Sequence, residues 1–512
     1  MSRSSPGRAW PRWLRDTAVL TLITFGLHAC GTWRAVPITN VETGKQSLAD
    51  VNIRVKQTGS PGMQTVHVSS VQFPYVEGFI DGDEPQPVKI DLRQVDQLEV
   101  YDPQTGLVIL AVVGAIILIA ALVTLIVALT KKSCPFVYVV TPEGPRLVGE
   151  AYSGAITKST QRADLMPLPA LGKGTARLLL ANEALEAQYT DQLELELVDH
   201  PAGIRALATA EARPILVGPS TPPTQVTDLG GADVTTLVAV QDGRSWESDL
   251  DAAATAPDPQ LREGLVVTFP RPRAGTTPVL ELQGGNTVWM DLVFGRFFAL
   301  FGDSLDAYLA ARDDPASAAG ALAWRQREGV DLSVEVSRGD RWERIGVVSP
   351  IGPVAARRVA VPLPAVDASG PLRVRLTGGL GFWRFDQVAL SELRSPEPGV
   401  IHLVAVKARQ DDGEDVRSLL AATDGRYQVL AKPGERVELA FNLPETAPGI
   451  VRDAFLFTRG YYLVYPSPDS TQSTATLRTL RDEPHSLSRF SLDLYRRYRE
   501  LALAQTDKAA PR

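Results

Sequence analysis

A long uncharged apolar segment constrains this chain more than any other feature. Residues Gly106 to Thr130, GLVILAVVGAIILIAALVTLIVALT, contain no charged side chain. A helix needs about 20 apolar residues to cross the hydrocarbon core of a bilayer. A long helix in a globular core normally keeps a polar face, and this segment has none. We therefore predict one transmembrane helix at residues 105–132.

The charges that flank this segment predict its orientation. Acidic side chains dominate residues 91–102, whereas Lys131 and Lys132 follow the apolar run directly. Basic residues next to a membrane span prefer the cytoplasmic side. Residues 133–512 are then expected in the cytoplasm, and a periplasmic location is the alternative.

The N-terminus has the pattern of a secretory signal. Four arginines precede an uncharged run from Thr17 to Ala29. A basic start followed by an apolar stretch of about 7–15 residues is typical of an export signal. We predict a lipoprotein-type signal peptide at residues 1–29.

Cys30 follows that run and is the predicted site of lipid attachment. Leu27 and Ala29 occupy the third and first positions before Cys30-Gly31. This arrangement resembles the bacterial lipobox, in which the cysteine receives a diacylglyceryl thioether. The alternative is an uncleaved apolar anchor whose last residue happens to precede a cysteine.

Composition excludes several classes of function. The net charge is -7, and basic and acidic residues are intermingled, so no basic stripe predicts a nucleic acid partner. Two cysteines, Cys30 and Cys134, cannot form a disulfide framework or a cysteine-rich zinc site. We predict no metal and no cofactor, because the histidines are scattered singly. The histidines are His28, His67, His200, His402 and His485.

The sequence of the rest of the chain predicts a mainly β fold. It contains 38 prolines and 41 glycines, which favour many turns over long helices. Residues 30–104 contain short runs of alternating apolar and polar residues, which indicate half-buried strands. We predict a small β-barrel or sandwich there. The runs are Val51–Val55, Thr65–Val68, Pro87–Ile90 and Gln97–Tyr101.

Three segments after the apolar span carry a resemblance to known proteins. They are SCPFVYVV at 133–140, GEAYSGAI at 149–156 and YTDQLELELVDHP at 189–201. In this order they resemble a group of uncharacterised bacterial envelope proteins and lipoproteins. The resemblance covers roughly residues 133–395 and the stretch GYYLVYP at 460–466. It implies a β-rich module without an assigned reaction.

The C-terminal part divides further by its pattern. We predict a β module at 133–228, a β-sandwich or jelly roll at 229–395 and a small β unit at 396–480. The sandwich contains a helical insert near Phe297 to Gln326. Residues 481–512 form an amphipathic helix and a tail, expected to dock on the protein, with the bilayer surface as the alternative.

Two local patterns suggest sites but fit structural roles better. Asp199 and His200 are neighbours on a predicted strand, so their side chains point to opposite faces and cannot easily share a proton. The aromatic residues around Trp383 could form a sugar-stacking platform. We expect them to pack between the sheets instead.

One short motif resembles a catalytic signature. Phe301-Gly-Asp-Ser-Leu305 resembles the nucleophile block of the GDSL esterases, and Asp482-Glu-Pro-His485 resembles their Asp-x-x-His block. That resemblance implies Ser304 as nucleophile, His485 as general base and Asp482 as its orienting group. The family places its serine after a buried parallel strand and carries a Gly-x-Asn-Asp block, which is missing between these motifs; Asn286 precedes the serine.

These observations favour a protein that binds over one that catalyses. We expect a membrane-anchored bacterial cell-envelope protein, a probable lipoprotein, with β-rich interaction or scaffold modules and no catalytic residues. Its partners are the lipid bilayer and an unidentified protein. The alternative is an envelope esterase that uses Ser304, Asp482 and His485.

Overall fold

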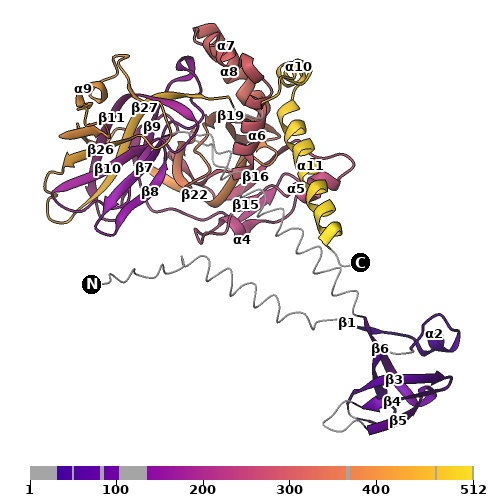
Figure 1. Cartoon of the computed structure of the whole chain (residues 1–512). Helices are drawn as coiled ribbons and strands as arrows, with labels where there is room; N and C mark the ends of the chain where they lie inside the picture. Colours follow the sequence, from indigo (N-terminus) through magenta and orange to yellow (C-terminus); the bar gives the residue numbers. More distant parts are fainter. Residues whose placement is uncertain are drawn as a thin grey trace, which may run out of the picture. The chain divides into compact units, whose positions relative to one another are not determined.

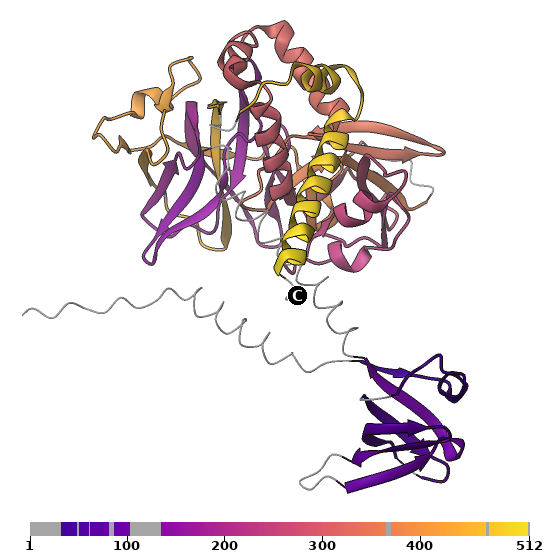
Figure 2. The same ribbon diagram turned by 45° about the vertical axis from the view of Figure 1, so that its right-hand side comes forward.

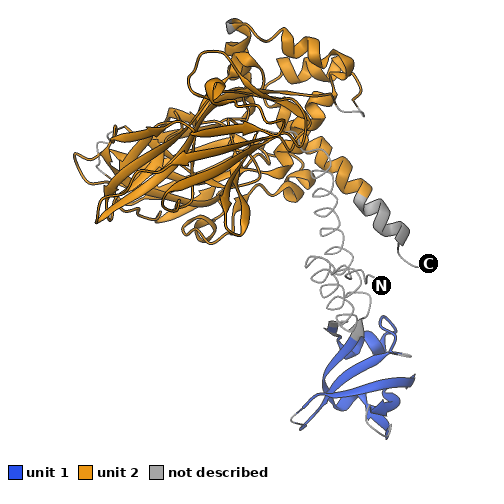
Figure 3. Cartoon of the chain, turned by 60° about the vertical axis from the view of Figure 1, so that its left-hand side comes forward, with its two compact units in different colours: residues 1–120, 502–512 blue, residues 121–501 orange. Residues whose placement is uncertain are grey.

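The computed structural model describes most of the chain, in two compact units. Its ranges are 32–48, 51–60, 62–80, 86–102, 135–364, 370–466 and 470–509. One unit comprises residues 1–120 with 502–512, and the other comprises residues 121–501 (Figure 3). The predicted signal peptide, Cys30 and the predicted span at 105–132 lie outside the described residues. Within those ranges, no helix combines the length and apolar character that a membrane crossing requires.

The described residues of the first unit form a six-stranded antiparallel sheet with the order β1-β6-β2-β3-β4-β5. All four strands predicted there are confirmed. Alternate residues such as Ile53, Val55, Val66 and Val68 are fully buried and make its core, as their period of two requires. The elements are β1 (Thr32–Ala35), α2 (Ile38–Glu42), β2 (Asn52–Gln57), β3 (Gln64–Gln72), β4 (Tyr75–Ile80), β5 (Gln86–Asp91), η1 (Leu92–Gln94) and β6 (Val95–Asp102).

The first and the last strands of the second unit belong to one β-sandwich. Its two sheets have the orders β24-β26-β10-β7-β8 and β23-β11-β27-β9, with β25 paired to β11. Leu193, Leu195 and Leu197 alternate along β11 and are buried in the core. The elements are β7 (Phe136–Thr141), β8 (Gly144–Glu150), η2 (Lys158–Thr160), β9 (Arg162–Pro167), β10 (Thr175–Ala181), β11 (Glu186–Pro201), β23 (Val400–Leu403), β24 (Lys407–Gln410), α9 (Arg417–Leu420), β25 (Gln428–Leu430), β26 (Arg436–Asn442) and β27 (Ile450–Val464).

A second sandwich is inserted between β11 and β23. Its sheets have the orders β12-β13-β22-β17-β20, with β15 paired to β22, and β14-β16-β21-β18-β19. The named strands of both sandwiches pair antiparallel within the described residues. The strand elements are β12 (Arg205–Ala208), β13 (Pro214–Val217), β14 (Gln225–Asp228), β15 (Trp246–Glu247), β16 (Arg262–Phe269), β17 (Pro278–Asn286), β18 (Leu332–Arg338), β19 (Arg341–Val348), β20 (Arg357–Pro362), β21 (Leu372–Gly379) and β22 (Trp383–Ser395).

The nesting joins parts of the chain that are far apart in sequence. The long strands β11 and β27 pair along almost their whole length, and Figure 1 shows them side by side. Strands from the segment 396–480, expected as a unit of its own, therefore share both sheets with strands from residues 136–201. The expected mainly β, sandwich-like architecture is confirmed.

The two sandwiches are two copies of one design. Residues 232–246 (ADVTTLVAVQDGRSW) and 414–428 (EDVRSLLAATDGRYQ) occupy equivalent places, with the short helices α4 (Thr235–Val238) and α9 in each. The carboxylate of Asp386 accepts hydrogen bonds from the backbone amides of the first Asp-Gly pair. Asp191 does the same for the second pair. Both aspartates sit at a bulge in a long strand.

Helices gather on one side of the second sandwich. The predicted helical insert is confirmed between β17 and β18. There, Asp314 caps α8 through the backbone amides of Ala316 and Ser317, and Gly329 ends it in the left-handed conformation. The helices are α5 (Leu250–Thr255), α6 (Val288–Ala299), η3 (Gly302–Ser304), α7 (Leu305–Ala310), α8 (Pro315–Glu328), α10 (Thr474–Asp482) and α11 (Ser486–Ala509).

The C-terminal helix α11 docks on the protein over its first half, which confirms the expectation. Leu487 and Leu492 are buried. The indole of Trp289 on α6 donates to Ser491 at 2.8 Å and meets the ring of Tyr495 edge-on at 5.3 Å between centroids. Figures 1 and 2 show α11 lying alongside α6.

Candidate functional site

The helices line an open cavity of about 650 Å³. Its walls come from α6, α7, α8 and α10, together with residues around η2. Pockets that bind small molecules are usually about 300–1,000 Å³ and mostly apolar. This cavity therefore has the size of a ligand site.

Aromatic rings form one wall of the cavity. Phe294, Phe297 and Phe301 recur every three or four residues, which places them on one side of the helical segment. The ring of Phe297 stacks on Trp324 with centroids 5.5 Å apart, and Phe301 lies 4.0 Å from the ring of Tyr308. The wall is apolar and rigid, because each ring is held by another.

Five arginines also line the cavity, and two of them form no close ion pair within the described residues. Arg312 lies 4.5 Å over the ring of Tyr308, and Arg478 is exposed on α10. Within the described residues, neither forms an ion pair with a carboxylate. The other arginines of the lining are already bound. Arg325 pairs with Asp331, Arg327 with Glu328 and Arg481 with Asp482.

Burial also affects a tyrosine in this wall. It raises the pKa of the Tyr308 hydroxyl, although the nearby charge of Arg312 acts in the opposite direction. Tyr308 therefore stays neutral at physiological pH. The cavity combines neutral aromatic walls with free guanidinium groups, which suit an apolar molecule that carries an anionic group.

Ser304, the candidate nucleophile, lies beside this cavity in a helical setting. Its hydroxyl donates to the carbonyl oxygen of Phe301 at 2.6 Å, within the turn of η3. It does not follow a buried parallel strand. Asn286 is buried on β17, where its side-chain oxygen accepts from the backbone amides of Ile351 and Gly352.

The other two residues of the GDSL resemblance have different partners. Asp482 pairs with Arg481 at 2.7 Å, and His485 accepts a hydrogen bond from Arg262 at 3.2 Å. Burial lowers the pKa of His485, and the charge of Arg262 lowers it further. In the described part of the chain, no hydrogen bond joins Ser304, Asp482 and His485. The geometry does not assemble them into a triad.

The remaining sequence candidates have the structural roles that were expected. Asp199 forms a bidentate pair with Arg452, whereas His200 bonds Asp453 at 2.9 Å. The two neighbours therefore do not share a proton. The aromatic side chains around Trp383 are buried in the sandwich core.

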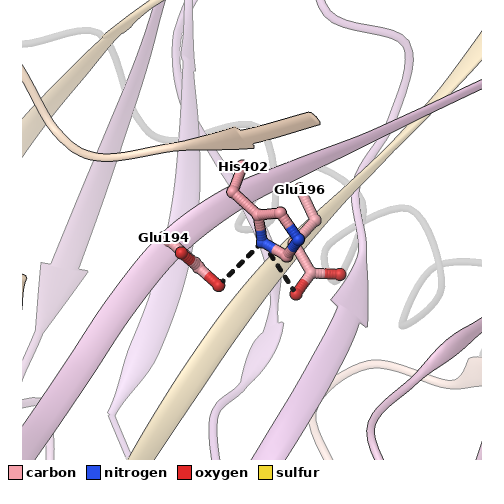
Figure 4. Close-up of side chains that lie close together, drawn as sticks. All are labelled: Glu194, Glu196 and His402. Carbon is pink, nitrogen blue, oxygen red and sulfur yellow. Dashed lines mark hydrogen bonds and ion pairs between the residues drawn. The ribbon is translucent and has the colours of Figure 1, made fainter. Parts of the chain in front are cut away.

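The structure also forms a cluster that the sequence prediction missed. Glu194 and Glu196 lie two residues apart on β11 and so share one face of the sheet. His402 on the neighbouring strand β23 is paired directly with Glu196. Figure 4 shows the three side chains converging, and their ligand atoms all lie within 4.8 Å of one another.

The imidazole of His402 lies close to both carboxylates of this cluster. Nδ1 of His402 lies 3.1 Å from a carboxylate oxygen of Glu194 and 3.8 Å from one of Glu196. The imidazole is 56% exposed, whereas the Glu196 side chain is only 7% exposed. The cluster is therefore closed at one end and open to solvent at the other.

The burial of Glu196 has a clear cause. Its cross-strand partner on the other side is Phe455 of β27, which lies in an apolar cluster. Loss of water raises the pKa of Glu196 to about 7; the charge of Glu194 adds to this rise, and His402 opposes it. Its Oε2 atom is buried without a hydrogen-bond partner.

A signal for this cluster exists in the sequence. The segment Leu193-Glu-Leu-Glu-Leu197 places two carboxylates on one face of a strand that is otherwise apolar. The segment around His402 shows the same alternation. What the sequence does not show is that these strands pair.

No protein family matches the sequence, and no curated protein is significantly similar to it. Any function must therefore be argued from the cavity and from the chemistry of its lining.

Proposed function

We propose that this chain is a membrane-anchored protein of the bacterial cell envelope whose second unit binds an amphiphilic anion. The anchor consists of a lipid on Cys30 and a transmembrane helix at residues 105–132. The nested sandwiches form a rigid scaffold for the binding site. The observation that carries the binding function is the cavity of about 650 Å³ with aromatic walls and free arginines.

The lining defines the ligand class. Burial of each methylene group in an apolar site contributes about 0.8 kcal/mol. Arg312 and Arg478 offer donors to a phosphate, sulfonate or carboxylate, which binds guanidinium through charge-assisted hydrogen bonds. A molecule with an alkyl chain and an anionic head satisfies both requirements. An anchored protein encounters such molecules at the bilayer.

A competition experiment tests the ligand class. The full-length protein, held in an amphipathic polymer rather than detergent, is incubated with a dansylated fatty acid, and energy transfer from its tryptophans, of which Trp324 lines the cavity, reports binding. Alkyl phosphates of increasing chain length then compete. We expect each added methylene to improve competition by up to about fourfold, which corresponds to about 0.8 kcal/mol, until the cavity is full.

Matched variants separate the cavity from nonspecific adsorption. Ala321→Trp fills the cavity from α8 and should abolish probe binding, whereas Ala319→Trp adds the same ring outside the lining. Arg478→Gln should weaken alkyl phosphates about tenfold, and Arg271→Gln, remote from the lining, should not. Equal effects within each pair would refute the proposed site.

The anchor is tested separately. Radiolabelled palmitate should enter the native protein but not the Cys30→Ser variant, and carbonate washing should leave the protein in the membrane. We propose that residues 133–512 lie on the cytoplasmic side. Protease cleavage of that part in intact spheroplasts would place it in the periplasm instead, and recovery of native protein in the soluble fraction would refute the anchor.

A further inference from the structure

We propose that Glu194, Glu196 and His402 bind a divalent transition metal ion, with Zn²⁺ as the representative ion. This site lies in the first sandwich and involves none of the residues that line the cavity. It therefore goes beyond the proposed function and does not depend on it.

The spacing of the donor atoms fits a metal centre. Zinc binds nitrogen and oxygen ligands at about 2.0–2.2 Å, so neighbouring donors of a tetrahedral site lie about 3.3 Å apart. The observed separations of 3.1 and 3.8 Å lie on either side of that value. All three donor atoms lie within 4.8 Å of one another, so the side chains must draw closer together around an ion.

The buried carboxylate provides an independent reason for a ligand. The Glu196 side chain is more than nine-tenths buried, and its Oε1 atom faces His402 (Figure 4). Its other oxygen, Oε2, is buried without a hydrogen-bond partner. A buried carboxylate is unfavourable unless its charge is compensated. A cation held by the cluster through Oε1 would compensate the charge of this carboxylate.

The second sandwich provides an internal comparison. Asp191 and Asp386 mark equivalent bulges in β11 and β22, so Glu194 and Glu196 correspond to Ala389 and Ser391. The equivalent strand β22 of the second sandwich therefore forms without carboxylates at these two positions. The fold of this strand therefore does not require the two glutamates, which agrees with a role for them in binding.

The ligand set indicates the kind of ion. One imidazole with two carboxylates suits zinc and its first-row neighbours, whereas calcium and magnesium prefer oxygen ligands alone. Three protein ligands leave a fourth position for water. That position faces solvent, because His402 is the exposed member of the cluster.

Calorimetric titration of the full-length protein with Zn²⁺, after treatment with EDTA, tests this site. We expect one Zn²⁺ ion per chain in the native protein and at least tenfold weaker binding in His402→Ala and Glu196→Gln. The matched control is His67→Ala, which removes an exposed histidine of another sheet and should bind Zn²⁺ as the native protein does.

Binding of Co²⁺ can be followed by visible absorption, which reports on the metal site itself and not on the stability of the fold. Co²⁺ bound to the native protein should show visible absorption bands that Zn²⁺ displaces and that the His402→Ala variant lacks, while circular dichroism shows that the variant is folded. Absence of stoichiometric Zn²⁺ binding, or equal binding by all three variants, would overturn the proposal. Calcium binding with the same affinity as Zn²⁺ would overturn the assignment to a transition metal.

Discussion

Replacement of Glu196 with glutamine should remove a large pH dependence from the stability of the second unit. Burial raises the pKa of Glu196 from 4.5 to about 7 in the folded protein. A group whose pKa is raised by folding contributes stability that is complete below about pH 4.5 and is lost as the pH rises through about 7. Glutamine has the same shape but no charge to bury, so the variant should escape this loss.

The magnitude follows from the pKa shift. One pKa unit corresponds to about 1.36 kcal/mol, so the full shift corresponds to about 3.4 kcal/mol. Water that reaches the open end of the cluster reduces this effect, and we expect the free energies of unfolding to differ by about 2 kcal/mol between the two proteins. The free energies of unfolding of the native protein and the variant should be nearly equal at pH 4.5, and that of the variant should be higher at pH 8.

The assay is urea unfolding followed by tryptophan fluorescence, with EDTA present to remove metal ions. Both proteins are measured at several values between pH 4.5 and 8, and only their difference is interpreted, since other groups titrate equally in both. A difference that stays constant across this range would refute the reasoning. Zn²⁺ added at pH 8 should stabilise the native protein alone.

Three further predictions concern other parts of the second unit. Asp191→Ala and Asp386→Ala should each lower the free energy of unfolding by about 1–3 kcal/mol in denaturant titrations, because each leaves two backbone amides without an acceptor. The loss should be larger for Asp191, which also accepts a hydrogen bond from Gln161 at 2.8 Å, and an unchanged stability of either variant would contradict the proposed role of these aspartates. Arg357→Met should lower the free energy of unfolding by about 3–5 kcal/mol, because it removes the main partner of the buried Asp164 carboxylate. A decrease below 1 kcal/mol in the same titrations would show that this ion pair is dispensable. Ser304→Ala should leave hydrolysis of p-nitrophenyl butyrate unchanged, and a selective loss of that activity would support the esterase alternative.

Much of the local structure could be predicted from the sequence. The alternation of apolar residues predicts the strands of the first unit, and helical periodicity predicts the amphipathic helix that α11 forms. These patterns are local consequences of how side chains alternate along a strand or recur along a helix. They require no knowledge of which strands pair.

The candidate site depends on information that is not local. His402 is exposed, and its pairing with Glu196 joins strands on either side of the inserted sandwich. The sequence predicts a helical insert near Phe297 to Gln326, yet the cavity also needs α10 from the far end of the chain. The local pattern marks Glu194 and Glu196 on one face of a strand, but the pairing of distant segments that completes each site cannot be predicted from it.

The nesting of the sandwiches also sets the order in which this chain can fold during synthesis. The second sandwich is complete once Ser395 has been made, whereas β11 gains its first strand partner only with β23 (Val400–Leu403) and its longest one with β27 (Ile450–Val464). Until then β11 carries an unpaired edge, which is prone to aggregation. The second sandwich can therefore fold first. The strands of the first sandwich depend most on chaperones until the end of the chain has been synthesised.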